Sequence, residues 1–126
     1  MAGEQVLVVE DNEMNMKLLR DVLYATGYRT LEATTGAEAV ELATLHAPDL
    51  VLMDIQLPDI DGVQALRRLR ADDRTAGIPV LAVTAQAMAG SRQGFLDAGF
   101  DGYVSKPLNI REFIRMVRQH FDERAT

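Results

Sequence analysis

The sequence contains no cysteine. Disulfides, thiolate metal sites and a cysteine nucleophile are therefore excluded. Positive charge is also scarce, because 13 basic residues face 19 acidic ones and leave a formal net charge of −6. Such an acidic chain lacks the strongly basic surface that direct binding to DNA or RNA requires.

Long apolar runs are missing as well, since each spans only a few residues and a membrane helix needs roughly 20. The N-terminus, from Met1 to Gln5, has neither the basic region nor the apolar stretch of a secretion signal. These absences predict a soluble, cytoplasmic protein that does not enter the membrane. The length of 126 residues fits one domain.

Short apolar runs alternate with amphipathic stretches five times along the chain. The runs Val6–Val9, Leu50–Met53 and Pro79–Val83 are apolar at every position or nearly so. This pattern is typical of central strands in a parallel sheet that helices cover on both sides. Two more polar segments, 28–33 and 100–105, fit strands nearer an edge. The alternation predicts an α/β fold, a (βα)5 chain wound on both faces of a five-stranded parallel sheet.

The stretches between these runs carry helix signals of unequal strength. Thr35 with Glu38 three residues later predicts a capping box at the start of the second helix. Asn109 and Glu112 have the same spacing at the start of the last one. The fourth helix, expected at about residues 88–98, is the weakest, because each of its two glycines costs on the order of 1 kcal/mol relative to alanine.

Four of the predicted strands end in polar side chains. Glu10 and Asp11 follow the first strand, Asp54 the third, Thr84 the fourth and Lys106 the fifth. In an open parallel sheet, ligands bind at the carboxyl ends of the strands, near the point where the strand order reverses. The five side chains therefore predict one pocket with three carboxylates, one hydroxyl and one ammonium group.

The charges of this pocket indicate its chemistry. Two carboxylates ~4 Å apart repel by roughly 4 kcal/mol at an effective dielectric constant of about 20. A hard divalent cation relieves this repulsion, and oxygen ligands without histidine or cysteine favour Mg²⁺. We therefore predict phosphoryl-transfer chemistry, with Asp54 as the nucleophile and Asp11 and Glu10 holding Mg²⁺. Thr84 and Lys106 would each contact a phosphoryl oxygen.

The whole chain resembles the receiver domain of bacterial two-component response regulators. Four segments carry the resemblance in the family's order: V-L-V-V-E-D-N-E, L-V-L-M-D-I-Q-L-P, V-L-A-V-T-A and Y-V-S-K-P. The spacing also matches, since Thr84 lies 30 residues after Asp54 and Lys106 lies 52 after it. The fold implied by the resemblance is flavodoxin-like, with strand order 2-1-3-4-5.

The resemblance implies that Asp54 accepts a phosphoryl group from a phosphohistidine, on a sensor histidine kinase or a histidine phosphotransferase. It implies that Mg²⁺ is bound by Asp11 and Asp54, by Glu10 through water, and by the backbone carbonyl of Gln56. Glu10 stands where the family more commonly has aspartate. This departure keeps the charge and lengthens the side chain.

The resemblance also implies a switch. Thr84 would be the switch hydroxyl, Lys106 would pair with the phosphate, and Tyr103 falls at the family's switch aromatic. An aromatic that merely packs on a helix from an edge strand is the other interpretation of Tyr103. A fourth helix weakened by Gly90 and Gly94 would move readily when Thr84 moves, unless these glycines serve close packing instead.

Two segments indicate a subfamily of receiver domains. E-D-N-E-M-N-M-K-L and M-D-I-Q-L-P look like the corresponding segments of DivK-type single-domain regulators of cell-cycle control. They also look like receivers fused to hybrid histidine kinases, although a start near the first strand and a short tail after the last helix favour a free-standing protein. We expect one receiver domain over residues 1–126 with no effector domain, because the last helix uses up the chain. The output would be contacts with downstream regulatory proteins through the fourth helix, fifth strand and fifth helix, made by a monomer or weak dimer.

Two other functions fit the sequence less well. A phosphatase of the haloacid dehalogenase type needs a second carboxylate two residues after the nucleophile, where this chain has Gln56. A flavin electron carrier needs a phosphate cradle after the first strand, and the acidic residues there would repel a phosphate. We interpret the remaining loop aspartates as turn and surface carboxylates: Asp59, Asp61, Asp72, Asp73 and Asp101.

Overall fold

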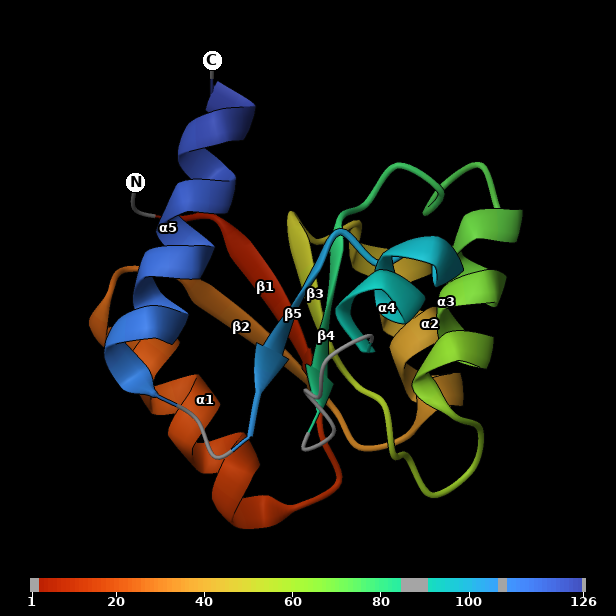
Figure 1. Cartoon of the computed structure of the whole chain (residues 1–126), viewed down its shortest axis with the longest axis horizontal. Coiled ribbons are helices and arrows are strands. Elements are labelled where there is room, and N and C mark those ends of the chain that lie inside the picture. Colours follow the sequence, from red (N-terminus) through yellow and green to blue (C-terminus); the bar gives the residue numbers. More distant parts are fainter. Residues whose placement is uncertain (1–2, 85–90, 107–108, 126) are drawn as a thin grey trace.

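The computed structural model describes residues 3–84, 91–106 and 109–125. Within these residues, strands and helices alternate along the chain (Figure 1). The strands are β1 (Gln5–Val9), β2 (Arg29–Ala33), β3 (Leu50–Asp54), β4 (Val80–Thr84) and β5 (Gly102–Ser105). The helices are α1 (Glu13–Ala25), α2 (Gly36–His46), α3 (Gly62–Ala71), α4 (Ser91–Ala98) and α5 (Ile110–Ala125). The start predicted for the fourth helix, near residue 88, lies outside the described residues.

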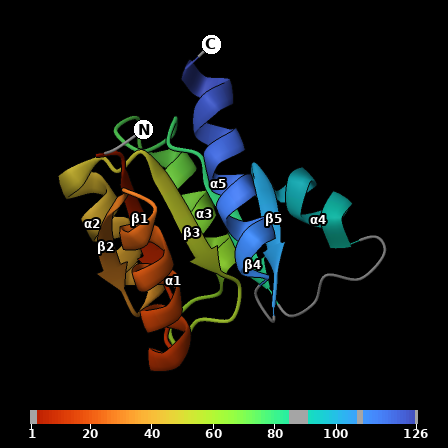
Figure 2. The ribbon, with the colours of Figure 1, turned by 90° about the vertical axis from the view of Figure 1, so that its left-hand side faces the viewer.

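The five strands form one parallel sheet in the order β2-β1-β3-β4-β5. This confirms the predicted fold class and strand order. Helices α1 and α5 cover one face of the sheet, and α2, α3 and α4 lie on the other (Figures 1 and 2). The carboxyl ends of the strands point to the lower edge of the view in Figure 1, so the side chains that follow them gather there.

Both faces of the sheet pack into apolar cores, which explains the unbroken apolar runs of the central strands. In β1, Val6 and Val8 belong to the core beneath α1 and α5, whereas Leu7 and Val9 belong to the core beneath α2 and α3. All four side chains are almost completely buried. Each contributes roughly 1.5–3 kcal/mol of transfer free energy, so the cores hold the strand ends in fixed register.

The predicted helix caps form, with one difference. The Thr35 hydroxyl accepts a hydrogen bond from the Glu38 amide at 3.1 Å, and Asn109 caps α5 in the same way at Glu112. The Glu38 carboxylate, however, accepts from the amide of Thr34 at 2.8 Å rather than from that of Thr35. The Glu38 carboxylate therefore caps the amide one residue before the N-cap, instead of the amide of the N-cap residue Thr35 itself.

No helix in the described ranges 3–84, 91–106 and 109–125 is long and apolar enough to cross a membrane. The longest, α5, has 16 residues and carries an amphipathic pattern rather than a uniformly apolar one. Its apolar side chains, including Phe113, Val117 and Phe121, face the sheet.

Candidate functional site

Three carboxylates meet at the carboxyl ends of β1 and β3. Glu10 and Asp11 follow β1 directly, and Asp54 is the last residue of β3. Each offers an oxygen that lies within 4.8 Å of the others. Glu10 and Asp54 are only 1% and 4% exposed, whereas Asp11 is open to solvent. The three carboxylates predicted to meet at the strand ends therefore lie together, two of them buried and one accessible.

Lys106 reaches into this cluster from the end of β5. Its ammonium nitrogen lies 3.0 Å from Oε1 of Glu10 and 3.2 Å from Oδ2 of Asp54. Its backbone amide donates to the carbonyl of Thr84 at 2.7 Å, which ties the start of the lysine to the end of β4. Strands β1, β3, β4 and β5 are thus linked at one edge of the sheet.

The electrostatics of the pocket leave it short of positive charge. Burial raises the pKa of Glu10, and the neighbouring Asp54 raises it further, although Lys106 and the Asn12 amide act against this. Burial acts to lower the pKa of Lys106, but the carboxylates of Glu10 and Asp54 outweigh it, and the net direction is upward. One ammonium group faces three carboxylates, so the site has the charge and the oxygen donors that suit Mg²⁺.

Among the residues that the structure describes, this is the only group of three or more acidic or histidine side chains arranged to share a metal ion. The donor set is made of carboxylate oxygens alone, with no imidazole. Such a set fits Mg²⁺ and not zinc or copper.

The carboxylate of Asp54 is held at both oxygens. Oδ1 accepts from the backbone amide of Gln56 at 2.9 Å, and Oδ2 accepts from Lys106 at 3.2 Å. The side chain of Gln56 is exposed. The function of the Gln56 carbonyl as a ligand stays a prediction.

Gly62 was not singled out from the sequence as a site residue, yet it shapes the loop after Asp54. A Cβ atom at Gly62 would lie 2.7 Å from the Asp54 carbonyl oxygen and 3.0 Å from Cα of Ile55. The Gly62 amide also donates to the Ile55 carbonyl at 2.9 Å. The first turn of α3 therefore packs directly on the backbone of Asp54 and Ile55, a contact across the loop that no local pattern reveals.

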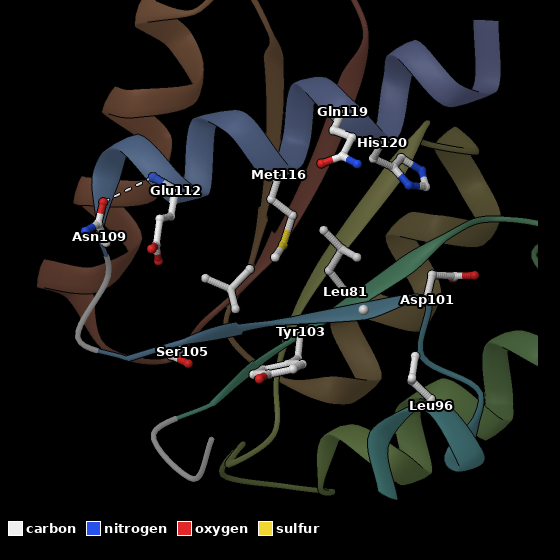
Figure 3. Close-up of a pocket in the computed structure, with 12 residues that line it drawn as sticks. Leu81, Leu96, Asp101, Tyr103, Ser105, Asn109, Glu112, Met116, Gln119 and His120 are labelled. Atoms are coloured by element: carbon white, nitrogen blue, oxygen red, sulfur yellow. Dashed lines mark hydrogen bonds between the residues drawn. The ribbon is translucent and has the colours of Figure 1, made fainter. Parts of the chain in front are cut away.

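The two residues predicted to switch occupy neighbouring strands. Thr84 ends β4, is buried, and pairs in register with Ser105 of β5. Tyr103 of β5 is half-buried and packs against the core beneath α2 and α3, pointing away from α5 in Figure 3. Both positions are compatible with the predicted roles, and movement of either side chain stays a prediction.

Helix α4 contains Gly94, while Gly90 lies outside the described residues. Among the described residues, a Cβ atom at Gly94 would meet no atom within 4 Å, and the residue is exposed. The described part of the chain therefore gives no packing reason for a glycine at this position.

Sequence comparisons place the chain among signalling proteins. A family model described as the response regulator receiver domain matches residues 6–118. The polar-differentiation response regulator DivK of Brucella anthropi is 44% identical over 120 residues, which cover 95% of this chain and 98% of that protein. DivK of Brucella ovis is 43% identical with the same coverage.

Solved structures give the same result. The receiver domain of sensor histidine kinase PA1611 from Pseudomonas aeruginosa, with a magnesium ion coordinated in its active site cleft, is 36% identical. It aligns with a TM-score of 0.85 over 94% of this chain and 97% of its own. The chemotaxis protein CheY4 of Vibrio cholerae shares the fold, with a TM-score of 0.86 at 23% identity over 94% of this chain and 98% of its own.

Proposed function

The chain belongs to the response regulator receiver family, and from this we propose that it accepts a phosphoryl group on Asp54 from a histidine kinase or a histidine phosphotransferase. The observation that carries the proposal is the buried Asp54 carboxylate, 3.2 Å from the ammonium of Lys106 and within a cluster of acidic oxygens. A carboxylate in this setting is a fixed nucleophile beside a fixed cation.

In the proposed step, an Asp54 oxygen forms a bond to phosphorus while the P–N bond of the phosphohistidine breaks. The electron pair of the broken bond stays on the imidazole nitrogen, which takes up a proton. Asp54 is already oriented by the Gln56 amide, so little reorganisation is needed before attack. Lys106 then pairs with a phosphoryl oxygen, and the Thr84 hydroxyl contacts another.

Mg²⁺ would be held by Asp11, Asp54, Glu10 and the backbone carbonyl of Gln56. When bound, it neutralises the carboxylates and the charge on the transferred group. The oxygen-only donor set supports this assignment, as does the magnesium ion in the related receiver of PA1611.

We propose that the chain acts as a cytoplasmic, single-domain regulator in cell-cycle or cell-division control, over residues 1–126 and without an effector domain. Its 44% identity to DivK over nearly the whole length of that protein supports this. A receiver of a hybrid kinase phosphorelay is the alternative, supported by its likeness to the PA1611 receiver. In both cases the chain is a signalling module whose own chemistry is limited to gaining and losing a phosphoryl group.

The proposed output surface is the face of α4, β5 and α5. A groove of about 580 Å³ lies there, lined by apolar side chains such as Leu96 and Met116 and by polar ones such as Glu112 (Figure 3). Tyr103 also lines it, so a change in Thr84 and Tyr103 would alter the surface that a downstream regulator contacts. The proposal takes the chain as a monomer or weak dimer.

The test is intact mass spectrometry after incubation with acetyl phosphate, with and without Mg²⁺, on the wild type and on Asp54→Asn. We expect a gain of one phosphoryl group that requires both Mg²⁺ and Asp54. A folded wild-type protein that gains nothing would make it a receiver that works without phosphorylation, and the proposed switch would fall with the proposed chemistry.

A further inference from the structure

The first turn of α2 is capped by a residue from a distant loop. Oδ1 of Asp59 accepts from the amide of Gly36 at 2.8 Å, and Oδ2 accepts from the amide of Ala37 at 2.9 Å. The Thr35 hydroxyl accepts from the next amide, that of Glu38, and the helix's own hydrogen bonds begin with the Ala39 amide and the Thr35 carbonyl. Three of the amides that a helix start leaves open are thereby satisfied, two of them by a carboxylate 22 and 23 positions along the chain.

Packing reinforces this contact. A Cβ atom at Gly36 would clash with Cγ1 of Ile60, so the start of α2 packs closely against the Ile60 side chain. The same hypothetical Cβ would be 3.5 Å from Oδ1 of Asp59. The loop between β3 and α3 is therefore held on the start of α2 in two ways. Asp59 accepts hydrogen bonds from the helix amides, and Ile60 packs against the helix backbone.

The loop held in this way begins at the proposed nucleophile. Its first residue, Ile55, donates to Val83 of β4 at 3.1 Å, and the Gln56 amide donates to Asp54. Its far end is held by Asp61, which caps α3 at Gln64. Between these two ends, Asp59 ties the middle of the loop to α2.

The start of α2 is itself connected to the other side of the acidic cluster. Ala33, at the end of β2 and three residues before α2, accepts a hydrogen bond at 3.0 Å from the amide of Glu10. The end of β1, which supplies Glu10, is thus hydrogen-bonded to the segment that leads into the helix that Asp59 caps.

We propose that Asp59 is a positioning residue for the metal site. It fixes the loop that carries Gln56 against α2, and so sets the spacing between this loop and the segment that carries Glu10 and Asp11. The inference rests on the proposed function, because it concerns Mg²⁺ at the same cluster. It assigns a role to a carboxylate that touches neither metal nor phosphate.

The experiment measures the dissociation constant for Mg²⁺ by titration of backbone amide shifts in the wild type, Asp59→Ala and Asp59→Asn. We expect Asp59→Ala to weaken Mg²⁺ binding about tenfold, the lower end of the loss when an outer partner of a metal site is removed. Asp59→Asn keeps one acceptor oxygen and should fall between the two. At saturating Mg²⁺, the rate of phosphorylation by acetyl phosphate should stay within about twofold of the wild type, because the reacting groups are intact.

The matched control is Asp72→Asn, which removes a charge and a hydrogen-bonded pair with Arg74 at the other end of α3. It should leave Mg²⁺ binding unchanged even where it lowers stability. Thermal unfolding of every variant, run without metal, separates loss of fold from loss of affinity.

Three results would overturn the positioning role. One is a dissociation constant for folded Asp59→Ala equal to that of the wild type. Another is equal weakening in Asp59→Ala and Asp59→Asn, which would assign the effect to lost charge. A third is a wild-type protein that binds no Mg²⁺, and that result alone would also remove the metal from the proposed function.

Discussion

Lys106 is the residue on which the charge balance of the site depends. Its ammonium lies 3.0 Å from Glu10 and 3.2 Å from Asp54, where it competes with any cation for the same oxygens. We predict that Lys106→Met lowers the free energy of unfolding without metal by roughly 1–3 kcal/mol, because buried carboxylates lose their partner. The same change should tighten Mg²⁺ binding about tenfold, since a competing charge is gone.

Urea unfolding in EDTA and a Mg²⁺ titration of the same two proteins test this prediction. The informative comparison is Lys106→Met against Lys17→Met, which removes an ammonium from an exposed pair with Asp21. The prediction is wrong if Lys106→Met binds Mg²⁺ more weakly than the wild type, or if both variants behave alike.

The lowered pKa values of Asp59 and Asp72 predict that the stability of the folded protein falls as the solution becomes acidic. Backbone amides of Ala37 and Gly36 lower the pKa of Asp59 from 3.8 to about 2, and the Arg74 side chain lowers that of Asp72 to about 2. A lowered carboxyl pKa stabilises the folded state above the unfolded pKa, and this contribution disappears as the pH falls from about 4 towards 2. The double variant Asp59→Asn/Asp72→Asn should therefore lose less stability than the wild type over that range.

Thermal midpoints at pH 5, 4, 3 and 2.5 provide the measurement. At pH 5 the wild type should be the more stable protein, and the two curves should converge at low pH. Curves that run parallel from pH 5 downwards would show that neither carboxylate carries a lowered pKa.

For single residues, the sequence predicted those contacts that follow from one rule, namely that the carboxyl ends of parallel strands meet at one edge of the sheet. It did not predict contacts between other parts of the chain. Glu10, Asp11, Asp54 and Lys106 were expected to meet because each follows a strand of one parallel sheet, and the structure brings them together. Asp59 is exposed in the loop after β3, as expected for a turn and surface carboxylate, and it also caps α2, which the sequence did not predict. Its partners lie on another element, so only the folded chain reveals the contact.

Among the elements, the start of α3 packs closely on the end of β3, since a Cβ atom at Gly62 would lie 2.7 Å from the Asp54 carbonyl oxygen. We predict that Gly62→Ala destabilises the protein by about 1–3 kcal/mol, the usual cost of overpacking. The displaced backbone carries Asp54, so phosphorylation by acetyl phosphate should also slow. Gly77→Ala is the matched control, because a Cβ atom there meets nothing within 4 Å.

Urea unfolding and intact-mass kinetics on both glycine variants check this prediction. Gly77→Ala should stay within about 0.5 kcal/mol of the wild type, as surface changes usually do. Equal effects of the two substitutions would mean that the approach of α3 to Asp54 is looser than the structure has it.

Helix α4 gives a prediction of opposite sign. Gly94 is exposed and a Cβ atom there would meet nothing within 4 Å, so Gly94→Ala should stabilise the helix by about 1 kcal/mol. Hydrogen exchange at residues 91–98 should slow accordingly. Unchanged or faster exchange in this segment would contradict the interpretation of α4 as a helix weakened by its glycine.

The elements show where sequence patterns lose precision. The central strands β1, β3 and β4 were predicted within a residue, because burial on both faces gives an unbroken apolar run. The edge strand β5 was expected from Phe100 but begins at Gly102. Phe100 is buried in the core beneath α2 and α3, so its apolar character reflects packing rather than strand pairing.

For the whole molecule, the parallel order β2-β1-β3-β4-β5 is what turns separate strand ends into one site. The strand order reverses between β1 and β3, which places the carboxylates of Glu10 and Asp54 beside each other. Lys106 comes from β5, at the far edge, and spans to them past the end of β4. The same sheet carries the groove at α4, β5 and α5, so the site and the proposed output surface share strands β4 and β5.

The central claim is that Asp54 itself receives the phosphoryl group, and mapping the modified residue tests it most directly. Borohydride reduces an acyl phosphate on aspartate to homoserine, which peptide mass spectrometry locates. After treatment with acetyl phosphate and Mg²⁺, we predict homoserine at Asp54, and none in protein incubated with Mg²⁺ alone. Homoserine at Asp11, the corresponding reduced residue at Glu10, or a phosphoryl group stable to borohydride would contradict the claim.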